Sequence, residues 1–175
     1  MPMHPDDAAA RHADELNIRG RLELYGFAVD ARRWDLFDQI FSRQDLSVRH
    51  GDNFAHTDYQ EFVDAFDRIH VGFDITRHSM SNFIIDVDGD IARSLTYGQW
   101  RLVKLGLSGG DCWSSEGWYE DHWIRESVGW RITRRQSWEL WGEGNSAIAG
   151  VDQTQFRARR RALATSEHAA ALFLR

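Results

Sequence analysis

The fold of this chain is decided by one stretch, residues 76–90, which has the sequence TRHSMSNFIIDVDGD. Its apolar run Phe83-Ile84-Ile85 followed by the turn Asp88-Gly89 is typical of a strand that enters a hairpin. Strand alternation puts His78, Met80, Asn82 and Ile84 on one face, and Ser79, Ser81, Phe83, Ile85 and Val87 on the other. Because both faces carry apolar groups, we expect one to meet helices and the other to be buried against a second subunit.

The segments on either side of this strand differ in their hydrophobic period. Upstream, helical spacing predicts a helix over 10–30, a short helix from Trp34 and a third helix, capped by Asp58, that ends near Gly72. A brief strand is expected at 46–50. Downstream, alternation predicts strands over 76–87, 91–105, 116–125 and 130–141, with a flexible glycine-containing loop at 106–110. Helices followed by an antiparallel meander are the α+β pattern, in which helices cover one face of a curved sheet.

Composition and charge exclude several classes of protein. The 175 residues suit one domain, and the net charge is −6, so no basic excess favours nucleic acid as the main ligand. No run approaches the ~20 apolar residues of a membrane span. A single cysteine, Cys112, cannot form an internal disulfide, which fits a reducing compartment. We therefore expect a soluble cytoplasmic protein.

Aromatic residues are abundant, with eight Trp, ten Phe and four Tyr. Tryptophans can fill a core, line an apolar pocket or form an interface. Core packing is the simplest explanation for any one of them. We include Trp100, in the second predicted strand of the meander, among the candidate pocket residues.

A carboxylate and an imidazole are the candidate catalytic pair. Asp30 ends the first predicted helix, where the helix dipole disfavours negative charge, so it requires a partner. We expect Asp30 to meet His78 in a pocket. Imidazole is largely neutral near pH 7, so it can accept a proton. A carboxylate hydrogen-bonded to Nδ1 would hold the tautomer that leaves Nε2 free to act as the base. Tyr25 could donate a hydrogen bond to a leaving group or enolate.

Structural roles are open for all three residues. His78 could be a hydrogen-bonded structural residue at the start of a strand, and Asp30 could simply initiate a turn. Tyr25 could belong to the core, since it lies ~140° from Asp30 on an ideal helix.

Metal and cofactor sites are not expected. The histidines His50, His56 and His70 are scattered without a metal-binding spacing. The glycine-containing loop lacks the ending of a phosphate-binding loop. The aspartates of the 86–90 turn lack the remaining ligands of a calcium loop.

Six short motifs together resemble the SnoaL-like branch of the nuclear transport factor 2-like superfamily, over about residues 12 to 141. They are Tyr25 with Asp30, Trp34-Asp35, Thr76-Arg77-His78 with Asn82, Val87-Asp88-Gly89-Asp90, Gly117-Trp118-Tyr119-Glu120-Asp121, and Gly129-Trp130-Arg131-Ile132 with Arg135. The resemblance implies a cone-shaped α+β barrel of a strongly bent, mostly antiparallel sheet. Three helices would cover one face and enclose a pocket. It also implies a dimer or trimer. We divide the chain into a domain over 1–141 and an extension over 142–175, in which we predict a helix over 156–174.

The resemblance also implies chemistry. In the group of scytalone dehydratase, bile-acid dehydratase and hexachlorocyclohexane dehydrochlorinase, an aspartate ending the first helix bonds the histidine of the Thr-Arg-His motif. Asp30 and His78 occupy those positions, and the bile-acid enzyme has a tyrosine at the position of Tyr25. Later polar positions align less clearly. We place Arg125 and Tyr97 in the predicted substrate pocket, together with Asn82 and Trp100.

The sequence therefore predicts a cofactor-independent lyase, of the dehydratase type, acting on a small, apolar, ring-bearing molecule. An isomerase or cyclase could use the same proton abstraction. A different class is also open: a non-catalytic ligand-binding protein, or one like the small subunit of ring-hydroxylating dioxygenases. We expect a homo-oligomer without nucleic-acid or membrane partners.

Overall fold

The computed structural model describes residues 5–51 and 54–150. Its elements in chain order are helix α1 (Pro5–Asp30), the 3-10 helix η1 (Trp34–Gln39), strands β1 (Ser47–His50) and β2 (Phe54–His56), helix α2 (Tyr59–His70), strands β3 (Ile75–Asp88), β4 (Ile91–Val103), β5 (Cys112–Glu126) and β6 (Gly129–Gly144), and the one-turn helix α3 (Ser146–Ala149).

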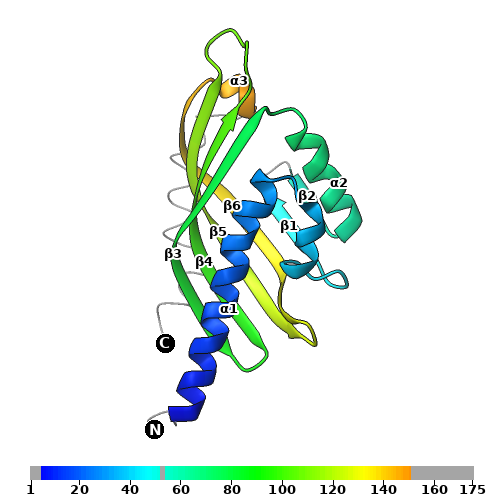
Figure 1. The fold of residues 1–175 in the computed structure, drawn as a ribbon, viewed down its shortest axis with the longest axis vertical. Coiled ribbons are helices and arrows are strands. Elements are labelled where there is room, and N and C mark those ends of the chain that lie inside the picture. Colours follow the sequence, from blue (N-terminus) through cyan, green and yellow to red (C-terminus); the bar gives the residue numbers. More distant parts are fainter. Residues whose placement is uncertain (1–4, 52–53, 151–175) are drawn as a thin grey trace.

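The six strands form one sheet in the order β2-β1-β6-β5-β4-β3 (Figure 1). All neighbours are antiparallel except β1 and β6, which run parallel. The two long hairpins turn at Gly89 and Gly129, whose φ angles of 60° and 104° favour glycine. A mostly antiparallel sheet preceded by helices confirms the predicted α+β class.

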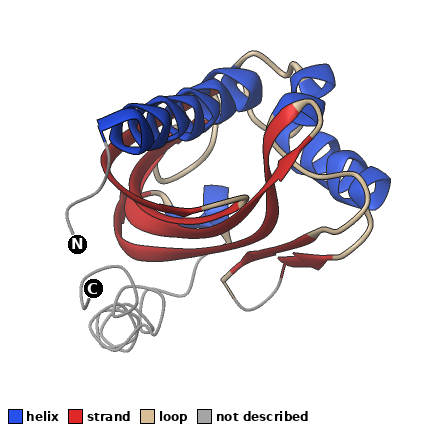
Figure 2. Ribbon diagram, turned by 90° about the horizontal axis from the view of Figure 1, so that it is seen from below, coloured by secondary structure: helices blue, strands red, loops and turns tan. Residues whose placement is uncertain are grey.

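The sheet is strongly curved, and its concave face is covered by helices (Figure 2). Helix α1 crosses this face with Ile18, Leu22, Tyr25 and Val29 buried beneath it. Helix α2 begins at the predicted cap, where the Asp58 side chain accepts a hydrogen bond from the Glu61 amide at 2.9 Å. Such a cap stabilises a helix by about 1 kcal/mol.

An aromatic cluster fills the space between η1, α2 and the sheet. Phe37 lies 5.2 Å from Phe41 and 5.5 Å from Phe62, measured between ring centroids. Phe62 in turn contacts Phe66 at 4.8 Å. This cluster fixes α2 above the sheet. Core packing, the simplest explanation for any one tryptophan, is confirmed for Trp113, Trp118, Trp123 and Trp130, which are buried.

One predicted feature of β3 is wrong. A bulge lies between Ser81 and Ile84, where Asn82 has a φ angle of 50° and is exposed. The extra residue reverses the alternation, so Ile85 joins His78 on the concave side instead of facing away from it. The simple two-face assignment of this strand therefore holds only up to Ser81.

Most predicted boundaries agree with the structure within four residues, as at β5, which begins at Cys112 instead of 116. Strand β2 was not predicted, because three residues are too few to show a period. The predicted C-terminal helix falls at 156–174, outside the described residues. In the described part of the chain, no helix has the length and apolar character needed to span a membrane.

Candidate active site

Asp30 and His78 are in direct contact at the junction of α1 and β3. Nδ1 of His78 lies 2.7 Å from Oδ1 of Asp30, and the backbone N–H of His78 donates to Oδ2 at 2.8 Å. Because a carboxylate only accepts, Nδ1 carries a proton, and in the neutral ring Nε2 carries the lone pair. The His78 side chain is 5% exposed and the Asp30 side chain 25% exposed. The Nδ1 contact sets the tautomer and the ring orientation, and the backbone contact holds the carboxylate against β3.

Helix α1 reaches β3 this closely because of Gly26. A Cβ atom at Gly26 would lie 3.3 Å from the His78 carbonyl oxygen, which is tighter than an ordinary contact. The small residue lets the last turn of α1 lie directly on the strand. The two hydrogen bonds from His78 then offset the unfavourable interaction between the Asp30 carboxylate and the negative end of the helix dipole.

Tyr25 lies beside the pair in the interior. Its ring is edge-on to His78, with 6.2 Å between centroids, and the guanidinium of Arg135 lies 4.3 Å above it. Burial raises the pKa of Tyr25, and Arg135 and a hydrogen bond with Tyr119 act in the opposite direction. The hydroxyl therefore stays protonated and can donate a hydrogen bond.

A buried ion pair is the part of the site that we had not assigned from the sequence. Arg135 on β6 donates to Asp121 on β5 through Nε at 2.7 Å and Nη2 at 2.8 Å, and both side chains are inaccessible to solvent. Burial alone would lower the pKa of Arg135, but Asp121 raises it above the ordinary value. The other guanidinium nitrogen, Nη1, has no partner among the described residues.

A row of polar residues crosses the concave face beside this ion pair. Thr96, Tyr119, Ser137 and His50 are register partners on four adjacent strands. Nδ1 of His50 hydrogen-bonds to Ser137, and burial lowers the pKa of His50 to about 3, so the ring is neutral. Within the described chain, His50 Nε2 and Thr96 Oγ1 are buried without a partner, as is Nη1 of Arg135. Such atoms are rare in folded proteins, and a ligand or water can satisfy them.

Trp100 is the one predicted pocket residue that lies beside the pair. It is the register partner of His78, and its indole N–H donates to the Tyr119 hydroxyl at 2.6 Å. The ring therefore links the His78 end of the sheet to the polar row.

The other three predicted pocket residues lie away from the Asp30–His78 pair. Tyr97 is 38% exposed on the opposite face of the sheet. Asn82 occupies the exposed bulge. Arg125 pairs with Asp14 at 2.7 Å and stacks over Trp130 at the far end of the hairpin. The physical causes are three: Tyr97 is an odd number of residues from Trp100 and so faces the other way, Asn82 lies in the bulge, and Arg125 lies at the hairpin end of β5.

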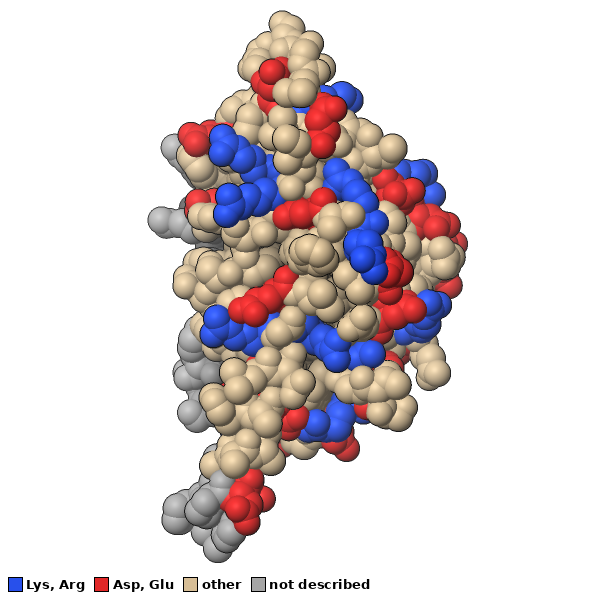
Figure 3. Space-filling model, viewed as in Figure 1, with Lys and Arg blue, Asp and Glu red and all other residues tan. Residues whose placement is uncertain are grey.

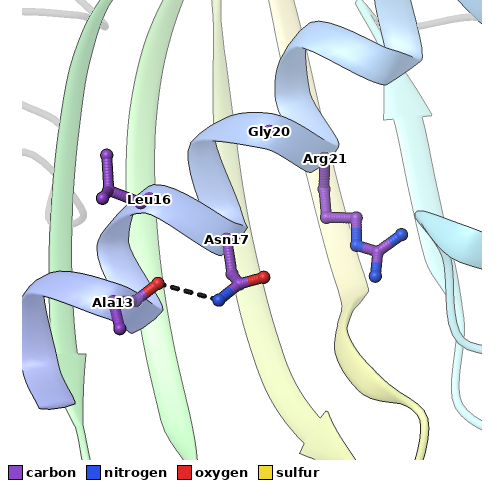
Figure 4. A pocket seen from close by; sticks show the side chains of 5 residues that line it. All are labelled: Ala13, Leu16, Asn17, Gly20 and Arg21. Atoms are coloured by element: carbon purple, nitrogen blue, oxygen red, sulfur yellow. Dashed lines mark hydrogen bonds between the residues drawn. The ribbon is translucent and has the colours of Figure 1, made fainter.

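A surface hollow of about 470 Å³ lies along α1, lined by Ala13, Leu16, Asn17, Gly20 and Arg21 (Figure 4). Its lining includes neither Asp30 nor His78. The Asn17 amide donates to the Ala13 carbonyl within the helix at 2.8 Å. The hollow therefore offers little chemistry and is separate from the candidate site.

Two further observations limit the kinds of ligand. Among the described residues, no three histidine, cysteine or acidic side chains are placed together to hold a metal ion. Basic and acidic side chains are interspersed over the face shown in Figure 3. That face therefore has no extended basic patch for a polyanion.

Comparison with known proteins places this geometry in context. Residues 10–136 match the family model described as the SnoaL-like domain. An uncharacterized protein of Mycobacterium tuberculosis strain H37Rv is 28% identical over 128 residues, 73% of this chain and 86% of the relative.

Two solved structures share the fold. A proposed scytalone dehydratase from Novosphingobium aromaticivorans superposes with a TM-score of 0.68 at 18% identity, over 80% of this chain and 91% of that one. A hexachlorocyclohexane dehydrochlorinase, LinA type 2, gives 0.67 at 12% identity, over 81% and 93%. The same fold occurs in a Salmonella enterica protein described as a member of the nuclear transport factor 2-like superfamily, with a TM-score of 0.65 at 17% identity, over 72% of this chain and 90% of that one.

Proposed function

We propose that this chain, which belongs to the SnoaL-like family, is a cofactor-independent lyase that removes water from a small, ring-bearing substrate. The observation that carries the proposal is the two-point contact of Asp30 with His78, at 2.7 and 2.8 Å. The Nδ1 bond holds the ring in one orientation with Nε2 available as a base, and the backbone N–H bond holds the carboxylate in place to receive it.

The elimination follows from this tautomer. Nε2 of His78 takes the proton from a substrate carbon, and the C–H electron pair forms the new double bond as the C–O bond breaks. Asp30 stabilises the imidazolium that forms. The imidazolium then gives its proton to the departing hydroxyl, so water leaves and neutral His78 is restored.

The buried donors favour a carbonyl next to the carbon that loses its proton. Negative charge would develop on the carbonyl oxygen, and the unpartnered Nη1 of Arg135 can donate to such an oxygen. The Tyr25 hydroxyl, kept protonated by burial, is a second donor. Tyr25, Tyr119 and Trp100 offer aromatic surface to a ring. A β-hydroxy carbonyl compound with a ring is therefore the substrate class that fits best.

The names of the two structural neighbours support elimination chemistry by analogy of fold alone. Both names describe enzymes that remove a small molecule from adjacent carbons. The support is for the reaction type and does not extend to either substrate.

The test is a spectroscopic assay of water loss across a panel of ring-bearing β-hydroxy ketones. We expect His78→Gln and Asp30→Asn each to lower the rate by about 100-fold or more. The matched control is His12→Gln, which changes an exposed histidine on α1 and should leave the rate unchanged. Equal rates in the wild type and both site variants would remove the lyase assignment. A moved double bond without water loss would replace it with an isomerase.

A further inference from the structure

Arg32 has an unusual backbone conformation next to the candidate site. It lies two residues after Asp30, with a φ angle of 55°, in the left-handed region that residues other than glycine rarely adopt. This conformation is strained for a residue with a Cβ. Other contacts of Arg32 must therefore hold it in place.

Those contacts are made by the guanidinium. Nη1 donates to the Val29 carbonyl at 2.9 Å and to the Thr76 hydroxyl at 2.7 Å. Nη2 donates to the carbonyls of His70 at 3.1 Å and Phe73 at 3.4 Å. One side chain thus joins the end of α1, the end of α2 and the start of β3.

Two of these segments carry the reacting pair. Asp30 hydrogen-bonds to His78. Arg32, two residues after Asp30, hydrogen-bonds to Thr76, two residues before His78. The two links are parallel connections between the same helix end and the same strand. Thr76 and His78 share one face of β3, since they are two residues apart. A link through Thr76 therefore restrains the strand on the side where the imidazole lies.

We propose that Arg32 is a positioning residue that holds β3 against α1, so that His78 keeps both hydrogen bonds to Asp30. Arg32 contacts backbone carbonyls and a hydroxyl and is not placed to touch the substrate. Its catalytic meaning rests on the proposed function, whereas its effect on the geometry of His78 does not.

The charge of Arg32 also bears on the pair. Burial lowers the pKa of Arg32, and the nearby carboxylates of Asp30 and Asp67 act in the opposite direction. The guanidinium thus offsets part of the negative charge that Asp30 brings to the helix C-terminus. A lysine could keep this charge but could not donate to four acceptors from one planar group.

The experiment is amide hydrogen exchange of the full-length chain, read at His78, whose N–H donates to Asp30. Arg32→Gly is the main variant, because glycine accepts the left-handed conformation and the fold is kept. Thr76→Val removes only the link to the strand, and Arg32→Lys keeps the charge. Arg33→Ala is the matched control, since Arg33 is exposed and pairs with Asp35.

We expect the His78 amide to exchange about tenfold faster in Arg32→Gly and Thr76→Val, as one hydrogen bond is lost or loosened. The exchange rates of amides in β5 and β6 should stay unchanged. The His78 amide should exchange at an intermediate rate in Arg32→Lys and at the wild-type rate in Arg33→Ala. Unchanged exchange at His78 in both main variants would overturn the proposal. So would faster exchange spread evenly over the whole sheet, because that is the signature of a purely structural role.

This readout separates the two proposals. If the variants loosen His78 but no substrate of the panel loses water, the lyase assignment fails and the positioning role stands. If the wild type catalyses water loss but the exchange rate of the His78 amide is unchanged in the Arg32 variants, the positioning role fails and the lyase assignment stands.

Discussion

Arg135 and Asp121 form a bidentate ion pair in which both side chains are 0% exposed. Tyr25 and Tyr119 stack against the guanidinium at 4.3 and 4.5 Å, so aromatic rings replace the water that would otherwise solvate it. The pair therefore places a strong donor in the interior while adding no net charge. Its loss should affect stability as well as any chemistry.

Removing one partner of this pair leaves a buried charge without compensation. We expect Arg135→Met to lower the free energy of unfolding by about 3–5 kcal/mol. The double variant Arg135→Met with Asp121→Leu should be less destabilised than Arg135→Met alone, because no charge remains buried. Denaturant unfolding of the variants measures both values. Strictly additive losses would show that the two charges do not depend on each other.

Stability should fall between pH 6.5 and pH 4 because of two buried histidines. Burial lowers the pKa of His70 to about 4 and that of His50 to about 3. The unfolded chain, with histidine pKa values near ~6.5, binds more protons across this range, so acid favours unfolding. His70 alone should contribute a loss of about 3 kcal/mol.

The check is the pH dependence of denaturant unfolding in the wild type and in His70→Phe. Phenylalanine keeps the stack on Phe66, at 5.1 Å in the wild type, but cannot be protonated. The variant should therefore show a shallower slope. His12→Gln, on an exposed residue, should keep the wild-type slope, and an unchanged slope in His70→Phe would contradict the assignment.

Substitution by alanine should change the stability of the protein in opposite directions at two glycines. A Cβ at Gly98 would lie 2.7 Å from the Tyr119 ring, so Gly98→Ala should cost about 1–3 kcal/mol by overpacking. Gly20 has no atom within 4 Å of that position and lies within α1, so Gly20→Ala should stabilise by about 0.5–1 kcal/mol. Thermal unfolding compares the two variants, and equal shifts of Tm would refute the packing argument.

Arg125 should matter little for turnover. It pairs with Asp14 and Asp90 on the surface, away from His78, and is 37% exposed. Arg125→Ala should therefore leave the rate of water loss within about twofold and reduce stability by about 1 kcal/mol or less. A loss of rate as large as that of His78→Gln would contradict this prediction and show that Arg125 takes part in turnover.

The sequence was sufficient for the order and type of the main elements. Helical spacing before residue 72 and alternation after residue 76 correspond to α1, α2 and the strands β3 to β6. The expectation that Asp30 meets His78 came from family motifs and from the cost of a carboxylate at a helix end. The structure brings the two side chains together, while their catalytic role stays a prediction.

Strand register could not be obtained in this way. A bulge between His122 and Trp123 shifts the β5–β6 pairing by one residue, and this shift sets Asp121 opposite Arg135. Without it, Asp121 would face Arg134. The Asn82 bulge has the same effect on β3. Bulges depend on packing across the whole sheet, which local periodicity does not record.

The most direct test of the account is the protonation of the His78 ring, measured by nitrogen-15 NMR at about pH 8, where imidazole is largely neutral. We predict that the proton resides on Nδ1, in a hydrogen bond that Asp30→Asn alters, with Nε2 unprotonated. Exposed His12 serves as the reference signal. A proton on Nε2 in the wild-type protein would contradict the account, because His78 could not then act as the base that faces the substrate.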